Sequence, residues 1–245
     1  MSNSTKSAGK PEVWDQDWEY VAKLLPEFPG AFFGFATYGM QHGALDNKTR
    51  ELILLATNAS PSHFFSRGFL HHARAAKKSG ATVAEMIGVL TIFSTVGAQS
   101  VALGATLLAE QRSPHVSAAD ERVTEVRRRH QRLLGAPTPE SEAAISAAPE
   151  FWDRWLNLAE VCIGPHSALT PRVAHLVALA AFAQCTQLSV SGMRQHICGA
   201  LAAGATPADV LEVCELIAGL GGHAIATGVP LLLAEFERSD SSSQP

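Results

Sequence analysis

A glutamate and a histidine lie at equal distances from one break in the first half of the chain. Glu51 is on an apolar segment and His72 is on the next segment, and their midpoint falls between Pro61 and Ser62. If both segments are helices of an antiparallel hairpin, the two residues lie side by side. A carboxylate beside an imidazole fixes its tautomer, as general acid–base catalysis requires.

The second half has a matching pair with different chemistry. His175 and His196 straddle the midpoint between Cys185 and Thr186, so two imidazoles meet there. A buried pair that only bridges two helices is the alternative reading for both halves. The histidine recurs in both halves while its partner changes from Glu51 to His175, which favours a role in proton transfer. Pairing and burial shift the pKa values of such groups, as a proton-transfer site requires. The residues predicted to be catalytic are Glu51, His72, His196 and His175.

Three further residues are candidates for substrate binding, namely His63, Arg194 and His223. An arginine can bind a carboxylate through two hydrogen bonds, although a surface position is the simpler interpretation of Arg194. His63 is expected at the start of the second helix of the hairpin, facing a pocket or solvent. His71 points about 100° away from His72 on a helix, and we expect it to be solvated or paired elsewhere.

No metal or cofactor is predicted. Two sets of possible ligands occur, Glu51 with His63 and His72, and His175 with His196 and His223. Neither has the spacing of a short metal motif such as H-E-x-x-H. The sequence also has no glycine-rich phosphate loop, nucleophile elbow or dinucleotide-binding fingerprint. The predicted chemistry is therefore proton transfer without a cofactor.

The segments that must position these residues have the pattern of helices. Apolar residues recur at three- and four-residue spacing, and no Asn-Gly or Asp-Gly hairpin turn occurs. Predicted helix N-caps are Asp46, Thr82, Thr170 and Thr206, with Pro171 in the first helical position. The predicted fold class is all-α.

The chain contains a long internal repeat. At an offset of 124 residues, 45–104 aligns with 169–228 without a gap, and the triplet Gly-Ala-Thr at 80–82 coincides with that at 204–206. This pattern predicts a tandem duplication of one small helical domain. The predicted parts are a disordered tail (1–11), a first repeat (12–111), a charged linker (112–149), a second repeat (150–238) and a second disordered tail (239–245). Within the linker, residues 120–134 are predicted to form a solvated helix.

Composition limits the classes of partner. Only 17% of the residues are charged and the net charge is −4, which argues against nucleic-acid binding. We expect no membrane partner, because no apolar run is expected to reach the roughly 18 uncharged residues that a span needs. We also expect no secretory signal, so the predicted location is cytoplasmic. The four cysteines form no C-x-x-C pair and are expected to be buried thiols. Low charge favours a homo-oligomer.

Several segments resemble the carboxymuconolactone decarboxylase family. They are LDNKTRELI at 45–53, HARAA at 72–76 and GAT at 80–82, and the segments 169–172, 196–200 and 204–206 repeat the pattern. The resemblance implies an all-α, alkylhydroperoxidase-D-like domain that assembles as trimers or hexamers. A two-domain chain would then form a trimer that resembles a hexamer. The family includes cofactor-free decarboxylases of aromatic catabolism and thiol peroxidases.

Departures from the family pattern narrow the activity. Residues 63–68 and 187–192 contain no cysteine, so the dithiol of the peroxidase branch is missing. The interval between Glu51 and His72 is also two residues longer than the usual family spacing. The resemblance thus implies a cofactor-independent decarboxylase, or a related lactone-transforming enzyme, whose substrate is a small carboxylated lactone or organic acid. Hydrolysis and isomerisation remain open, as does a non-catalytic ligand-binding or scaffold protein of the same fold.

Overall fold

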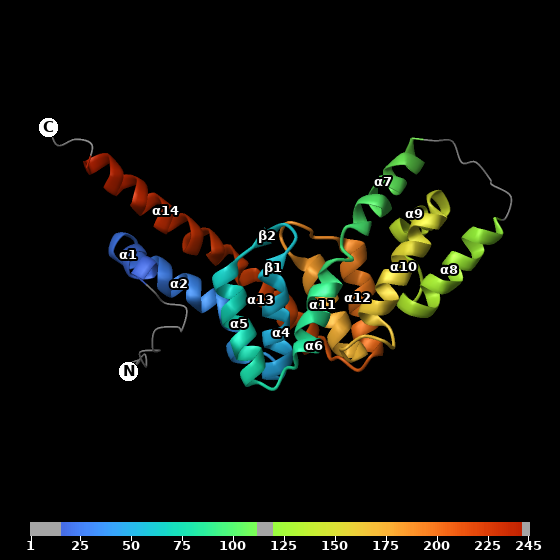
Figure 1. Ribbon diagram of the computed structural model, residues 1–245, viewed down its shortest axis with the longest axis horizontal. Coiled ribbons are helices and arrows are strands. Elements are labelled where there is room, and N and C mark those ends of the chain that lie inside the picture. The colour runs from blue at the N-terminus through green and yellow to red at the C-terminus, as the bar shows by residue number, and fades with distance from the viewer. Residues whose placement is uncertain (1–15, 112–119, 242–245) are drawn as a thin grey trace, which may run out of the picture.

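The computed structural model describes residues 16–111 and 120–241, which fold almost entirely into helices (Figure 1). The all-α prediction is confirmed. The first half contains α1 (Gln16–Leu24), α2 (Glu27–Ala36), α3 (Tyr38–His42), α4 (Asn47–Thr57), α5 (Ser66–Lys78), α6 (Val83–Phe93) and α7 (Ala98–Glu110). The second half contains α8 (Glu121–Leu134), α9 (Pro139–Ala147), α10 (Pro149–Ile163), α11 (Pro171–Ala183), α12 (Val190–Ala202), α13 (Pro207–Ala218), the 3₁₀ helix η1 (Gly219–Gly221) and α14 (Gly222–Ser241).

The two tails lie largely outside the described residues. The predicted tail 1–11 is not described, and neither is 242–245. The helix α14 continues to Ser241 and so takes in the first three residues of the second predicted tail.

Capping side chains start equivalent helices at equivalent residues. In α4, α6, α11 and α13 the cap accepts a hydrogen bond from the backbone N–H three residues further on. These caps are Asp46, Thr82, Thr170 and Thr206, as predicted. Each cap contributes about 1 kcal/mol to helix stability. Because the caps are at equivalent positions, the corresponding helices of the two repeats begin at the same local sequence signal.

The two halves meet at residues that are equivalent in the repeat. The Ser60 hydroxyl donates a hydrogen bond to Gln184 Oε1 at 2.6 Å, and the Ser62 and Thr186 hydroxyls are 2.8 Å apart. Both pairs are separated by the repeat offset of 124 residues. Equivalent residues of two copies touch where an axis relates the copies. The predicted duplication is therefore present as two halves around an approximate twofold axis.

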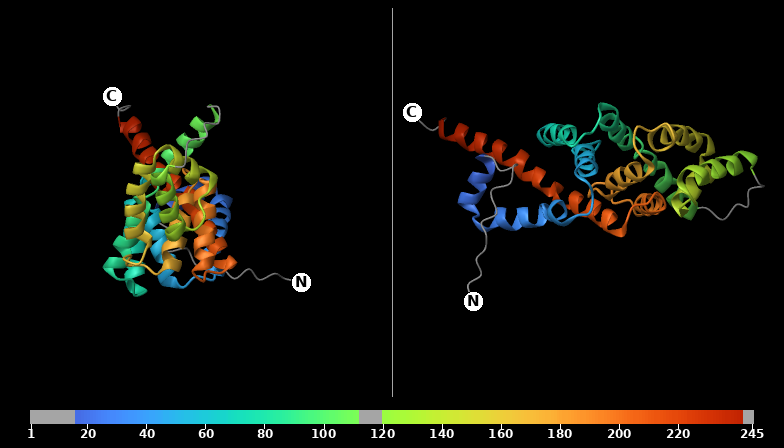
Figure 2. Two further views of the ribbon diagram at one scale, coloured as in Figure 1. Left: turned by 90° about the vertical axis from the view of Figure 1, so that its right-hand side faces the viewer. Right: turned by 90° about the horizontal axis from the view of Figure 1, so that it is seen from below.

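The halves exchange their last helices across this axis. α14, from the second half, packs against α1, whereas α7, from the first half, packs against α9. The views in Figure 1 and Figure 2 show α1, α2 and α14 at one end of the molecule and α7 to α10 at the other. Each half consequently receives one wall from the other half.

The core lies between α4 and α11, which pack side by side. Their apolar residues are buried on nearly all sides, which is typical of central helices. The largest of these buried side chains are Leu52, Ile53, Leu55, Leu176, Leu179 and Phe182.

The break between α4 and α5 differs from the prediction. Residues 59–64 form a two-residue antiparallel strand pair, β1 (Ala59–Ser60) with β2 (His63–Phe64). His63 thus lies in β2, before the second helix of the hairpin and not at its start. The cysteine prediction also needs correction, since Cys162 is buried but Cys185 and Cys198 are exposed.

Two stretches, 83–110 and 207–238, are long and apolar enough to cross a membrane by length and composition, contrary to the prediction. The first stretch is divided between α6, with 11 residues, and α7, with 13 residues. Each is shorter than the roughly 20 residues that a span requires. The second stretch is interrupted at η1 between α13 and α14. Core helices of soluble proteins pass the same test, so this is weak evidence for a membrane protein.

Candidate functional site

The hairpin of α4 and α5 brings Glu51 and His72 into contact. His72 Nδ1 and Glu51 Oε2 are 2.8 Å apart, and both side chains are 14% exposed. The predicted adjacency is confirmed, whereas the catalytic role remains a prediction. When Nδ1–H donates to the carboxylate, Nε2 is the nitrogen left to exchange a proton with a ligand.

His72 forms part of the wall of a cavity of about 500 Å³. This volume is typical of sites for small molecules. Large apolar side chains in its lining are Trp18, Phe32, Phe33, Met40, Leu54, Leu216 and Leu220. Polar side chains in its lining include Asn58, Arg67, His71, His72 and His223. The cavity can therefore hold a small, mainly apolar molecule that also meets several polar groups.

The exchanged helix α14 supplies a third histidine to this cavity, besides His71 and His72. His223 Nδ1 is 3.2 Å from His63 Nε2, and the Phe65 ring is centred 4.3 Å from the His223 ring. Burial, together with nearby His63, lowers the pKa of His223 to about 4, so its imidazole is neutral at pH 7. His63 does not line the cavity but contacts a residue that does. The two repeats thus complete one site together.

Asn58 carries an unpaired acceptor at the cavity. Its side chain is 2% exposed, and its Nδ2 donates to the Leu54 carbonyl at 2.8 Å. Its Oδ1 is buried without a hydrogen-bond partner among the described residues. A Cβ atom at Gly68 would lie only 2.0 Å from this oxygen, so glycine is required there. Gly68 thus lets α5 approach Asn58 closely.

The second repeat brings His175 and His196 together in a closed setting. Their Nδ1 atoms are 3.0 Å apart, as the hairpin argument predicts, and both side chains are buried. Burial lowers the pKa of His175, and it lowers that of His196 to about 3. The Phe182 ring stacks on His196 at 5.3 Å, and a Cβ atom at Gly199 would collide with the His175 ring. This pair is packed into the core as two neutral rings.

The helix α8 covers the part of the second repeat that corresponds to the cavity. It was predicted to be a solvated helix, but Val126, His130 and Leu134 on one face are buried. The Trp152 indole donates to His130 Nδ1 at 3.2 Å, and burial lowers the pKa of His130 to about 4. The prediction is wrong for this face because the helix packs against α10 and α12.

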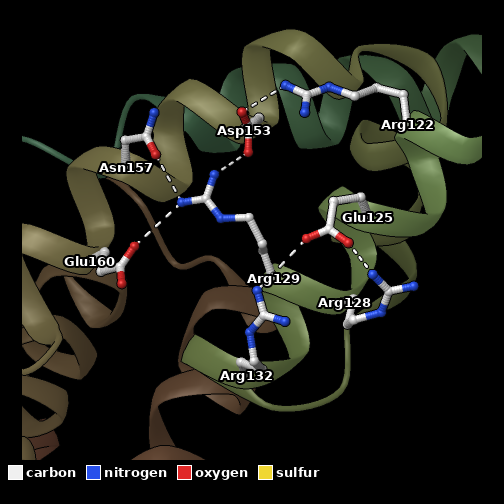
Figure 3. Close-up of polar contacts among 8 residues, drawn as sticks. All are labelled: Arg122, Glu125, Arg128, Arg129, Arg132, Asp153, Asn157 and Glu160. Carbon is white, nitrogen blue, oxygen red and sulfur yellow. Dashed lines mark hydrogen bonds and ion pairs between the residues drawn. The ribbon is translucent and has the colours of Figure 1, made fainter.

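Charged groups fasten α8 to α10 (Figure 3). Arg122 and Arg129 both bind Asp153, and Arg129 also reaches Asn157 at 2.8 Å and Glu160 at 3.3 Å. The residues of the second repeat that contact or face α8 include the counterparts of cavity residues. These are Gln195 and His196, at the positions of His71 and His72.

Arg194 is not brought to the cavity. It is exposed on α12 and is not among the residues that line the cavity. Sequence reasoning in turn missed His71 and Asn58, which do line it. The repeat carried a signal for Asn58, because a polar residue there corresponds to an aromatic residue, Phe182, in the second copy.

Alanine at His130 is expected to lower the free energy of unfolding by about 2–4 kcal/mol. The change removes a ring that is 0% exposed and leaves the Trp152 N–H without its acceptor. Urea denaturation measures the loss. His166→Ala, at an exposed histidine, is the matched control and should stay within about 0.5 kcal/mol of the wild type. Equal stability of the two variants would show that His130 does not pack as described.

Comparison with known proteins agrees with this architecture. A family model described as the carboxymuconolactone decarboxylase family matches residues 26–111 and again 149–232. A protein from Burkholderia xenovorans LB400, provisionally named a gamma-carboxymuconolactone decarboxylase subunit, has a solved structure that is similar with a TM-score of 0.82. It is 28% identical, and the similarity covers 92% of each chain. A search of curated proteins gave no match. The duplicated fold and both family matches show that this chain belongs to the carboxymuconolactone decarboxylase family.

Proposed function

We propose that the chain is a cofactor-independent decarboxylase, or a closely related lactone-transforming enzyme, of aromatic catabolism. Its substrate is a small carboxylated lactone or a similar ring-cleavage product. The observation that supports this function best is the His72–Glu51 contact at the wall of a cavity that is otherwise mainly apolar. An apolar wall favours loss of the substrate carboxylate charge, and a paired imidazole can supply the proton.

In the proposed decarboxylation, His72 is the only proton donor from the protein. The bond between the ring carbon and the carboxylate breaks and CO₂ leaves. The electron pair is delocalised through the unsaturated lactone to its carbonyl oxygen. His72 then transfers the proton from Nε2 to carbon, and solvent restores that proton. Glu51 stabilises the imidazolium through Nδ1, at 2.8 Å.

Turnover of a carboxylated unsaturated γ-lactone in D₂O tests this function. Decarboxylation releases one CO₂ and leaves one deuterium in the product. Hydrolysis would instead release acid without CO₂, and isomerisation would do neither. The function is rejected if the wild type accelerates none of the three reactions above the buffer rate.

We propose a structural role for the second repeat. The closed packing of His175 and His196 and the position of α8 over the counterpart of the cavity support this role. The alternative of a non-catalytic scaffold has its best support in the second repeat too, because that repeat can hold α14 in place without binding a ligand of its own. Ligand titration should accordingly saturate at one molecule per chain.

We propose a homotrimer as the assembly, with small organic acids as the remaining partners and the cytoplasm as the location. Large apolar side chains are exposed on α7 and α14, which supports burial against other copies. These side chains are Leu103, Leu107, Leu108, Leu231, Leu232 and Phe236. Light scattering should give three times the chain mass of 26.0 kDa. A monomer at micromolar concentration would contradict this assembly.

A further inference from the structure

His223 lines the cavity and has one ring nitrogen that the protein does not use. Its Nδ1 is 3.2 Å from Nε2 of His63, in the other repeat. Its Nε2 forms no hydrogen bond among the residues that the structure describes, and it is not one of their buried, unpartnered polar atoms. This nitrogen is therefore accessible to a molecule in the cavity, and the proton transfer assigned to His72 and Glu51 makes no use of it.

Contacts with neighbouring rings fix the His223 side chain in place. Its ring lies against the Phe65 ring, with centroids 4.3 Å apart and an interplanar angle of 32°. The His63 ring is centred 5.2 Å away. A Cβ atom at Gly222 would lie 2.6 Å from Cζ of Phe32, so α14 begins in close contact with α2. The free nitrogen of His223 is thus held in position before a ligand arrives, as a preorganised hydrogen-bonding group must be.

The equivalent residue of the other repeat is used differently. At the repeat offset of 124, His223 corresponds to Gln99, on the exchanged helix α7. Gln99 Oε1 accepts hydrogen bonds from the hydroxyls of Ser189, at 3.1 Å, and Ser191, at 3.5 Å, at the start of α12. Gln99 therefore fastens an exchanged helix to the hairpin of the other half. His223 does the same through His63 but keeps a nitrogen for the cavity, which favours a role toward a ligand.

The protonation of the His63–His223 pair decides what His223 offers to that ligand. Burial, with nearby His63 and His72, lowers the pKa of His223 to about 4, so its ring is neutral at pH 7 and carries one proton. When Nε2–H of His63 donates to Nδ1 of His223, the proton of His223 is on Nε2. A neutral imidazole holds this proton firmly, so it donates a hydrogen bond without losing the proton.

We propose that His223 donates a hydrogen bond from Nε2 to the substrate oxygen that becomes negatively charged in the reaction, and that His63 is a positioning residue that fixes the tautomer of His223. In the decarboxylation this atom is the lactone carbonyl oxygen, which receives the electron pair of the broken carbon–carbon bond as CO₂ leaves. The proton of His72 goes to carbon, and the proton of His223 stays on nitrogen. The role rests on the proposed function for the identity of the oxygen, but binding of an oxyanion does not require turnover.

Binding of 4-nitrophenol to the full chain tests the donor without turnover. Its ring suits the aromatic part of the lining, and its phenolate absorbs visible light whereas its phenol does not, so absorbance gives the pKa of the bound hydroxyl. A hydrogen bond to the charged form lowers this pKa. His223→Ala should therefore raise the pKa of the bound phenol by about one unit relative to the wild type, equivalent to about tenfold weaker binding of the phenolate.

Three further variants separate the two histidines. His223→Gln keeps an N–H donor and should bind the phenolate within about threefold of the wild type. His63→Ala should weaken phenolate binding about tenfold, and His63→Gln, which restores a donor to Nδ1 of His223, should recover most of the loss. Gln99→Ala is the matched control, at the equivalent position and outside the cavity, and should bind as the wild type does. The melting temperature of each variant establishes that it is folded.

Turnover of a carboxylated lactone tests the same donor during the reaction. His223→Ala should lower kcat by about 10²–10³-fold, the usual loss for one donor to a developing oxyanion. KM should change little, because the hydrogen bond strengthens only as the charge develops. A residue that merely joins α14 to the hairpin would lower the melting temperature and leave kcat of the folded protein unchanged.

Four results would overturn the proposal. These are no binding of the phenolate by the wild type, an unchanged pKa of the phenol bound to folded His223→Ala, no recovery by His63→Gln, and an unchanged kcat of folded His223→Ala. The proposed function can fail separately. If phenolate binding depends on His223 but no lactone reacts, the oxyanion donor stands and the decarboxylase assignment falls.

Discussion

Alanine at His72 is expected to lower the turnover of a carboxylated lactone by about 10²–10⁴-fold, the usual contribution of a general acid–base group. The reason is that His72 is the residue of the Glu51–His72 pair that lines the cavity. Glu51→Gln should also lower turnover, because the amide can still form a hydrogen bond but cannot stabilise an imidazolium by charge. Steady-state kinetics with the wild type and each variant measures both effects.

The effects of the Glu51 and His72 substitutions on turnover are expected to be coupled. The double variant should lose little more than the worse single variant, because residues that act as a unit are not additive. His166→Ala is a matched control at an exposed histidine. If the pair serves only to join α4 and α5, the single variants will melt at lower temperature and keep their turnover. That outcome would show that His72 takes no part in the reaction.

Acid is expected to destabilise the protein strongly below pH 6.5. Burial lowers the pKa of His130 to about 4 and that of His196 to about 3, whereas both take up protons near the ordinary value of 6.5 once unfolded. The unfolded chain therefore binds more protons in this window, and stability falls as pH falls. Each histidine contributes a slope of about 1.4 kcal/mol per pH unit.

Urea denaturation between pH 7.5 and pH 5 measures this slope. Burial alone would raise the pKa of paired carboxylates such as Asp153 and Asp209, but their hydrogen bonds and arginine partners hold it below the ordinary value of 3.8. Their protonation therefore adds to the loss mainly at lower pH. His130→Gln removes one titrating ring and should reduce the slope by about 1.4 kcal/mol per pH unit. A free energy of unfolding that is flat across this range would contradict the burial of neutral histidines.

Local signals in the sequence were enough to predict much of the fold. The caps at Asp46 and Thr170 and the offset of 124 residues depend on neighbouring residues or on self-similarity alone. The exchange of α7 and α14 could not be predicted in this way. Two copies have the same sequence similarity whichever half a terminal helix packs against.

The same distinction holds for the candidate site. Glu51 and His72 meet across one hairpin, and their distances from its turn predict the contact. His63 and His223 are 160 residues apart in different repeats, and only the exchanged helix α14 brings them together. His71 was placed away from the site because it points away from His72. The cavity nevertheless reaches both residues, because α2 and α14 extend its walls around α5.

The two repeats have diverged at the positions that decide whether the site is open. Glu51 and Asn58 of the first repeat correspond to His175 and Phe182 of the second, where the rings pack into the core. The helix α8 covers the part of the second repeat that corresponds to the cavity. The cavity accordingly lies at the first repeat, and α14 of the second repeat forms part of its wall.

A crystal structure of the chain with a bound, unreactive carboxylated lactone tests most directly the claim that the first repeat holds the site. The account predicts one molecule per chain in the cavity, with a ring carbon or its carboxylate within about 3.5 Å of His72 Nε2. A molecule bound between His175 and His196, or one outside the cavity with His72 in contact only with Glu51, would contradict it.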